Sequence, residues 1–224
     1  MKLDEVMATL KRSASAQAKK TYLRHGSGPN VFGTPFAVIN PLAKKIKVDH
    51  ALAGQLWETG NGEARIVALL VADPAQLTKE QANAWAEHAH NRVYGHYLGP
   101  LVARSPHAAA LMRAWMKSKK EMVGLCGFSI LCGMLRDDPE GVSDAECEKV
   151  LADIEKRIHA SPNWVKYAMN STLIAIGGLK PSMKAKAIAV ARRIGKVDVD
   201  HGDTECRTPD ARTCIEKASK RRRC

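Results

Sequence analysis

The feature that most restricts the fold of this chain is a long succession of apolar, helix-like segments separated by breakers and caps. In residues 36–47, for example, apolar side chains recur at the spacing of one helix face. The run Gly60-Asn61-Gly62 closes the next segment, while Thr78 and Ser143 open later ones as N-caps. No stretch alternates convincingly as a half-buried strand does, so the sequence predicts an all-α protein.

The segments form successive helical hairpins of roughly 35–45 residues, a spacing typical of HEAT-type repeats. We therefore expect a HEAT-like repeat α-solenoid (an α-α superhelix), although a compact helical bundle is the alternative. A single domain is expected over residues 1–200, followed at 201–224 by a loop, a short helix and a basic tail. The expected helices are 2–24, 36–47, 49–59, 63–72, one from 78 onward, 108–117, 121–136, 143–160, 163–176 (ended by Gly177-Gly178), 181–195 and one after 208.

Residues 84–104 differ from the apolar segments on both sides of them. They gather three histidines, three aromatic residues and two arginines into one turn-and-helix unit. A segment this polar in the middle of a core-forming chain indicates a working surface. The alternative is that Trp85, Leu98 and Leu101 belong to the core and the histidines are ordinary solvated residues.

The charge of the chain favours a polyanionic partner. The net charge is +12 and the pI is about 9.5. Residues 1–47 hold nine Lys and Arg, residues 137–155 hold eight acids, and residues 156–200 again hold nine basic residues. This pattern suggests a basic binding side and an acidic side turned away, unless the blocks average out in three dimensions.

The sequence also bears on the location of the protein. The longest clean apolar runs, such as residues 66–72, are far too short to span a bilayer, and residues 1–20 lack the apolar core of a signal peptide. The six cysteines show no CxxC pairing, which is typical of reduced thiols. We expect a cytoplasmic monomer without a membrane or a cofactor.

Basic residues at or near predicted helix ends recur through the chain. A solenoid turns such residues toward one groove, where they contact phosphates without reading base sequence. Any one of them is as readily an ordinary surface residue. Together with His96, the candidates for DNA binding are Lys44, Lys45, Arg65, Arg92, Arg104, Lys119, Lys120, Lys166 and Lys184.

Four stretches carry a resemblance to a known family. Residues 22–74, 115–128, 163–177 and 195–211 resemble the bacterial AlkD-like DNA alkylation repair proteins, in the same order and spacing. The resemblance implies a HEAT-like α-solenoid whose concave, basic side holds double-stranded DNA. It also implies a chemistry, because the best-studied members are glycosylases that excise cationic N-alkylated purines.

The family's chemistry needs a carboxylate, tryptophan faces and an arginine, and this sequence departs from that pattern. Where active members carry a Trp-Asp pair, the chain has His90-Asn91-Arg92-Val93 and, a little further on, His96. The expected arginine is replaced within residues 121–125, and a later tryptophan by Asn170-Ser171. Glu87 is then the candidate catalytic carboxylate, as the only acid near in sequence.

Metal binding is a weak hypothesis here. No Cys or Asp completes a tetrahedral set with the histidines of residues 84–104. His201, Cys206 and Cys214 are more readily explained as a structural turn. The arginines of residues 221–223 are expected to form a solvated tail that would add affinity for phosphate.

Three classes of function follow: a DNA-repair glycosylase, a catalytically degenerate relative that binds damaged or branched duplex DNA, and a HEAT-repeat scaffold for a protein partner. The basic excess favours the first two classes, and the replaced residues favour the second over the first. The sequence therefore predicts DNA binding with a repair role and leaves excision of alkylated purines open.

Overall fold

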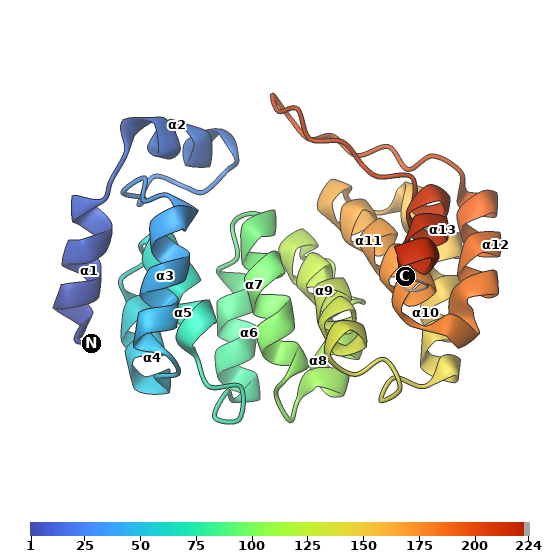
Figure 1. Cartoon of the computed structure of the whole chain (residues 1–224), viewed down its shortest axis with the longest axis horizontal. Coiled ribbons are helices and arrows are strands. Elements are labelled where there is room, and N and C mark those ends of the chain that lie inside the picture. The colour runs from blue at the N-terminus through green and yellow to red at the C-terminus, as the bar shows by residue number, and fades with distance from the viewer. Residues whose placement is uncertain (222–224) are drawn as a thin grey trace. The chain divides into compact units, whose positions relative to one another are not determined.

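The computed structural model describes the backbone of residues 1–221 and the side chains of residues 1–218. These residues form thirteen α-helices and two short 3-10 helices, with no strand among them (Figure 1), so the all-α prediction is confirmed. The basic tail predicted at residues 221–223 lies outside the described side chains. In chain order the elements are α1 (Leu3–Arg12), α2 (Ala16–Arg24), α3 (Phe36–Ile46), α4 (His50–Glu58), α5 (Gly62–Val71), α6 (Lys79–Glu87), α7 (Arg92–Ala103), α8 (Ala108–Trp115), α9 (Glu121–Asp137), α10 (Asp144–Arg157), η1 (Ile158–Ala160), α11 (Asn163–Leu179), η2 (Pro181–Met183), α12 (Lys184–Ile194) and α13 (Ala211–Arg221).

The chain divides into two compact units, an N-terminal unit of residues 1–107 and a C-terminal unit of residues 108–224. None of the helices in the described chain is long and apolar enough to cross a membrane. The five cysteines of residues 1–218 are free thiols. Burial raises the pKa of Cys126 to about 12 and that of Cys147 to about 11, so both thiols stay protonated and unreactive.

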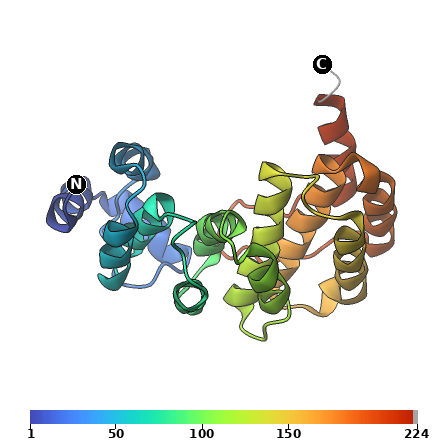
Figure 2. The same cartoon turned by 90° about the horizontal axis from the view of Figure 1, so that it is seen from below.

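In the N-terminal unit, α5 lies at the centre of the packing. It contacts α3, α4 and α7, and most of its residues are buried. Figure 2 looks nearly along the axes of several helices of this unit, which run side by side. The side chain of Asn61 starts α5 by accepting the N–H of Ala64 at 3.0 Å.

The prediction of one helix over residues 2–24 is wrong. The chain breaks between α1 and α2, where Ser15 caps α2 by accepting the N–H of Ala18 at 3.4 Å. The backbone N–H of Ser15 also donates to the carbonyl of Gly33 at 2.9 Å, which draws the chain out of the helical path. As a result α2 buries none of its residues and lies crosswise to α3 (Figure 1).

A buried carboxylate organises the loop of residues 25–35, hereafter the 25–35 loop. Glu63, in the first turn of α5, is only 2% exposed. The backbone N–H groups of Phe32, Gly33 and Thr34 donate to its two oxygens at 3.1, 2.5 and 3.0 Å. Gly33 is required there, because its φ is +93° and an added Cβ would lie 2.4 Å from the Ser15 carbonyl oxygen.

In the C-terminal unit, α9 packs between α8 and α11, and α11 also contacts α12 and α13. The expectation that Gly177-Gly178 ends the preceding helix is wrong, since α11 continues to Leu179. A Cβ on Gly177 would lie 2.8 Å from the Cβ of Ala187 and from the Cδ1 of Ile215. This glycine therefore permits the close approach of α11 to α12 and α13 rather than a turn.

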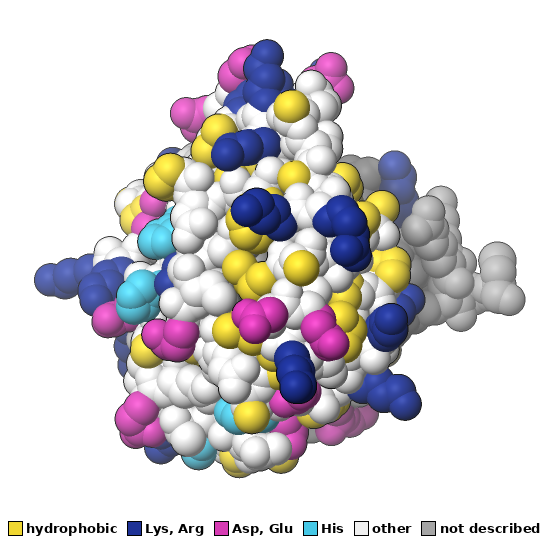
Figure 3. Space-filling model, turned by 90° about the vertical axis from the view of Figure 1, so that its left-hand side faces the viewer, with side chains coloured by type: hydrophobic (Ala, Val, Ile, Leu, Met, Phe, Trp, Pro, Cys, Tyr) yellow, Lys and Arg dark blue, Asp and Glu magenta, His cyan; other side chains and the backbone are white. Residues whose placement is uncertain are grey.

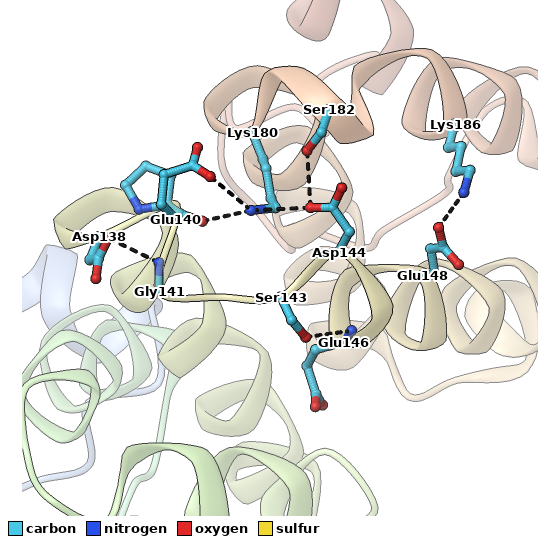
Figure 4. A network of polar contacts seen from close by, with 11 residues as sticks. Asp138, Glu140, Gly141, Ser143, Asp144, Glu146, Glu148, Lys180, Ser182 and Lys186 are labelled. Carbon is cyan, nitrogen blue, oxygen red and sulfur yellow. Dashed lines mark hydrogen bonds and ion pairs between the residues drawn. The ribbon is translucent and has the colours of Figure 1, made fainter.

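The acidic and basic blocks of the C-terminal unit pair with each other. Asp144 and Glu148 on α10 contact Ser182 and Lys186 (Figure 4). Glu155 further along α10 contacts Arg193, so the two segments run in parallel with a constant offset. Buried Lys180 joins the network through Asp144 at 3.2 Å, Glu140 at 3.7 Å and the Pro139 carbonyl at 3.0 Å. Burial alone would lower the pKa of Lys180, but the Asp144 hydrogen bond and the nearby acids outweigh it and raise that pKa. Within this unit the charge blocks therefore partly neutralise each other.

Replacing Glu63 by glutamine should destabilise the protein. The amide keeps one acceptor oxygen but turns an NH2 group toward backbone N–H groups that the carboxylate now satisfies. A buried donor left without an acceptor costs about 1–3 kcal/mol, so the free energy of unfolding measured with urea should fall by at least that amount. The matched control is Glu58→Gln on exposed α4 surface, expected within about 0.5 kcal/mol of wild type. Equal stability of the two variants would contradict the structural role of Glu63.

Candidate nucleic-acid interface

One end of the N-terminal unit collects three helix starts. The backbone N–H of Gly62, which opens α5, donates to the Asn30 carbonyl in the 25–35 loop at 2.9 Å. Asn91, the N-cap of α7, donates from Nδ2 to the Ser27 hydroxyl at 3.1 Å. The same loop leads directly into α3 at Phe36. Helix N-termini carry partial positive charge. At this end of the unit, hereafter the loop end, Glu63 already supplies an anion to the start of α5, and the starts of α3 and α7 remain to favour another.

Two arginines strengthen the positive charge of the loop end. Arg24 ends α2 and Arg92 opens α7, and the charges of both reach the imidazole of His25 between them. The pKa of His25 is lowered, first by burial and then by Arg92 and Arg24. The pKa of His90 is lowered by burial and by Arg65 and His88. At neutral pH these two histidines are therefore uncharged, and the arginines supply the charge.

Three half-exposed aromatic rings lie on the same face of the unit. Phe36 packs edge-on against Tyr22, with ring centroids 5.9 Å apart, and stacks against Tyr97 at 6.1 Å. We call Tyr22, Phe36 and Tyr97 the aromatic ledge. A small, mainly apolar cavity opens beside it, lined in part by Tyr22, Phe36 and Ile39. Sequence reasoning missed Tyr22, Phe36 and Arg24, because their segments are far from residues 84–104 in the chain.

The polar stretch of residues 84–104 is divided between core and surface. Trp85 is buried and stacks on Trp57 with centroids 4.6 Å apart, and Tyr94 packs edge-on against Trp57 at 6.2 Å. His88, His90 and His96 are exposed. The stretch thus contributes both to the core and to the surface of the loop end.

Arg65 has a structural role in this aromatic core. Its Nε donates to the Trp57 carbonyl at 3.2 Å, and its guanidinium lies 4.9 Å from the centroid of the Trp57 ring. Arg65 also donates a hydrogen bond to the hydroxyl of Tyr94. Burial raises the pKa of Tyr94, and this effect outweighs the lowering by Arg65. DNA binding by Arg65 would have to use the part of the guanidinium that these contacts leave open.

The other predicted DNA-binding residues of this unit lie at both ends of its helices. Arg92 and His96 are in the first half of α7, and His96 packs edge-on against Tyr97 at 5.1 Å. Lys44 and Lys45 are exposed in the last turn of α3, at the opposite end from Phe36, and exposed Arg104 follows α7. On the side of the molecule shown in Figure 3, the described Lys and Arg side chains are scattered among hydrophobic, neutral and acidic ones.

In the C-terminal unit, three of the four predicted cations lie near two neighbouring helix starts. Exposed Lys119 and Lys120 precede α9, and half-exposed Lys166 is in the first turn of α11. The two starts are joined by Glu121, which accepts the N–H of Trp164 at 2.7 Å. Lys184 opens α12 and so lies at the other end of α11.

The residues expected from the sequence to stand at the family's catalytic positions are engaged in structural hydrogen bonds. Asn91 is buried and caps α7 by accepting the N–H of Val93 at 3.0 Å. Glu121 binds the start of α11, and buried Asn170 donates to the Pro209 carbonyl at 2.9 Å. These side chains hold loops and helix ends in place, a role different from stabilising a sugar cation.

Two glutamates are the possible carboxylates at the loop end. Glu87 is exposed at the end of α6, just before the loop that leads to Asn91. Glu63 lines the cavity beside Tyr94. The sequence did not single out this glutamate, because it falls within an otherwise apolar helix. Its oxygens already accept three backbone N–H groups, so Glu63 is poorly placed to meet a sugar.

The loop of His201 has a packing role. The His201 ring lies edge-on against Trp164 at 6.0 Å and Tyr167 at 5.8 Å, and its Nε2 is 3.0 Å from the Thr208 hydroxyl. No group of three His, Cys, Asp or Glu residues that could hold a metal ion occurs in the described part of the chain.

Comparisons with known proteins agree with this architecture. A solved structure matches with a TM-score of 0.90 and 27% identity, covering 100% of this chain and 96% of that one. It is described as a new family of proteins related to the HEAT-like repeat DNA glycosylases with affinity for branched DNA structures. The HEAT-like repeat fold is therefore confirmed.

Two uncharacterised proteins, from Listeria innocua and Listeria monocytogenes, are each 26% identical over 226 residues, or 97% of this chain and 97% of each relative. The family model described as DNA alkylation repair enzyme matches residues 6–218. This protein belongs to the DNA alkylation repair family.

Proposed function

We propose that this protein binds DNA in a repair role, grips duplex arms through its basic residues and prefers branched DNA, without efficient excision of alkylated purines. The observation that carries the proposal is the loop end, where three helix starts lie with Arg24 and Arg92, whose charges both reach His25, and where α2, α3 and α7 supply the aromatic ledge. The similar solved structure, whose family is described as having affinity for branched DNA, supports the same reading. A monomer in the cytoplasm is part of the proposal.

In this proposal a double-stranded arm of the DNA lies along α3 and α7. Eleven residues of α3 span about 16 Å, so Lys44, Lys45 and Arg104 stand roughly that far from the loop end. Cations at both ends of these helices would meet phosphates on the two sides of a groove. Such contacts position DNA without reading its sequence. Lys119, Lys120, Lys166 and Lys184 would add contacts from the C-terminal unit.

Binding should depend steeply on salt and on the lysines of α3. If four to six phosphates are contacted, log K against log[salt] should fall with a slope of about −4 to −5. The double variant Lys44→Glu, Lys45→Glu should lose affinity for all duplex sequences alike and should flatten the slope by about 2. Fluorescence anisotropy over a salt series measures both quantities.

The matched control for this charge reversal is Lys149→Glu, Lys156→Glu on the exposed surface of α10, which makes the same change in net charge outside the proposed interface. It should alter the affinity much less and leave the slope near that of wild type. Affinity that ignores salt in wild type would instead support a HEAT-repeat scaffold that binds a protein.

Excision of N7- or N3-alkylated purines should be weak or absent. Asn91 occupies a capping position where active relatives are expected to place catalytic residues, and Glu63 is engaged by the backbone. Loss of one preorganised electrostatic partner costs about 10²–10³ in rate. Single-turnover release of 7-methylguanine from duplex DNA measures this directly. Robust release that vanishes in Glu87→Gln would show a working glycosylase with Glu87 as its carboxylate and would refute the proposal.

A further inference from the structure

The aromatic ledge is built from three separate elements and is only partly covered. Tyr22 comes from α2, which buries no residue, Phe36 from the first position of α3, and Tyr97 from the middle of α7. All three rings are half-exposed, and the centroid distances of 5.9 and 6.1 Å join them into one continuous surface.

One ring of the ledge is anchored by a hydrogen bond. The Tyr22 hydroxyl donates to the Thr34 carbonyl at 2.6 Å, and Thr34 is itself bound by Glu63. Burial, with the charges of Glu63 and Tyr97, raises the pKa of Tyr22 to about 12. The hydroxyl therefore remains a donor throughout the physiological pH range, and the ring keeps its orientation without a partner bound.

The surroundings of the ledge favour stacking over specific hydrogen bonding. The polar groups of the adjacent cavity are already engaged: Ser27 with Asn91, and Glu63 with the backbone of the 25–35 loop. Tyr94 also lines the cavity, and its hydroxyl is hydrogen-bonded by Arg65. Val31, Ile66 and Val93 add apolar lining. Aromatic faces in such surroundings accept any base, because every base has a π-face.

The charge beside the ledge fits a nucleic acid. Arg24 lies two residues beyond Tyr22 on the exposed end of α2, and Arg92 opens α7, the helix that carries Tyr97. The charges of both arginines reach His25, which directly follows α2, so phosphates that flank a base on the ledge would meet positive charge at this end of the unit. In continuous duplex DNA every base is already paired and stacked, whereas a branch point offers bases that are free to leave the stack.

We propose that the aromatic ledge stacks against an unpaired base at the branch point of DNA and gives the protein its preference for branched over continuous duplex. The inference rests on the proposed function, because it assumes that the loop end of the N-terminal unit faces DNA. Beyond the proposed function, the inference names the feature of the DNA that is recognised. That feature is an exposed base, and neither a bend nor the width of a groove.

The test uses the full chain and the double variant Phe36→Leu, Tyr97→Leu, which keeps apolar volume but removes two ring faces. The probes are a DNA fork with 2-aminopurine as the unpaired base at the branch and a continuous duplex of equal length. Wild type should quench the 2-aminopurine fluorescence and bind the fork more tightly than the duplex. Loss of stacking on one base should lower the fork-over-duplex ratio of affinities by about fivefold to a hundredfold and abolish the quenching.

Phe32→Leu is the matched control, since this half-exposed phenylalanine of the 25–35 loop lies outside the ledge; it should keep both quenching and preference. Thermal unfolding of all variants checks that the fold is intact. A fork preference that survives in the double variant, or equal losses on fork and duplex, would overturn the stacking inference while leaving DNA binding in place. Wild type that binds neither DNA would overturn the proposed function, and the inference with it. Binding of the fork without quenching would likewise overturn the stacking inference.

Discussion

The candidate interface depends on a single buried carboxylate. Glu63 accepts the backbone N–H groups of Phe32, Gly33 and Thr34 and so fixes the 25–35 loop over the starts of α5 and α7. From that loop, the Gly33 carbonyl binds the start of α2, and the Thr34 hydroxyl donates to the Leu10 carbonyl of α1 at 2.8 Å. A buried anion is stable only when fully hydrogen-bonded. The three backbone N–H groups provide these hydrogen bonds, and the same bonds fix the conformation of the 25–35 loop.

Several features of the fold follow directly from the sequence. The caps at Thr78 and Ser143 are confirmed, since their hydroxyls accept the N–H groups of Gln81 at 3.1 Å and Glu146 at 3.2 Å. Cap chemistry is local, and for that reason a sequence reveals it. The breaks that sequence reasoning misplaced depend on distant residues: the α1–α2 break on Gly33, and the continuation of α11 through Gly177 on the space near Ala187 and Ile215.

The candidate site was predictable only in part, for a similar reason. Residues 84–104 were expected to form a working surface, which stays a prediction. The structure buries Trp85, Leu98 and Leu101 and leaves the histidines exposed, as the alternative expected, and His96 packs against Tyr97 of the aromatic ledge. Tyr22 and Phe36 were missed because nothing local distinguishes them from core aromatics. The charge blocks of residues 137–155 and 156–200 predicted separate acidic and basic sides. In the structure, Glu148 and Glu155 of α10 instead form ion pairs with Lys186 and Arg193 of α12. Which cations remain available to a partner depends on helix register in three dimensions.

The central claim is that DNA meets the N-terminal unit at the loop end, where the aromatic ledge and two arginines adjoin three helix starts. Amide hydrogen exchange of the full chain, with and without a saturating DNA fork, tests this most directly. We predict that added protection concentrates in residues 22–36 and 88–97. Protection that spares both segments while the fork is bound would contradict it.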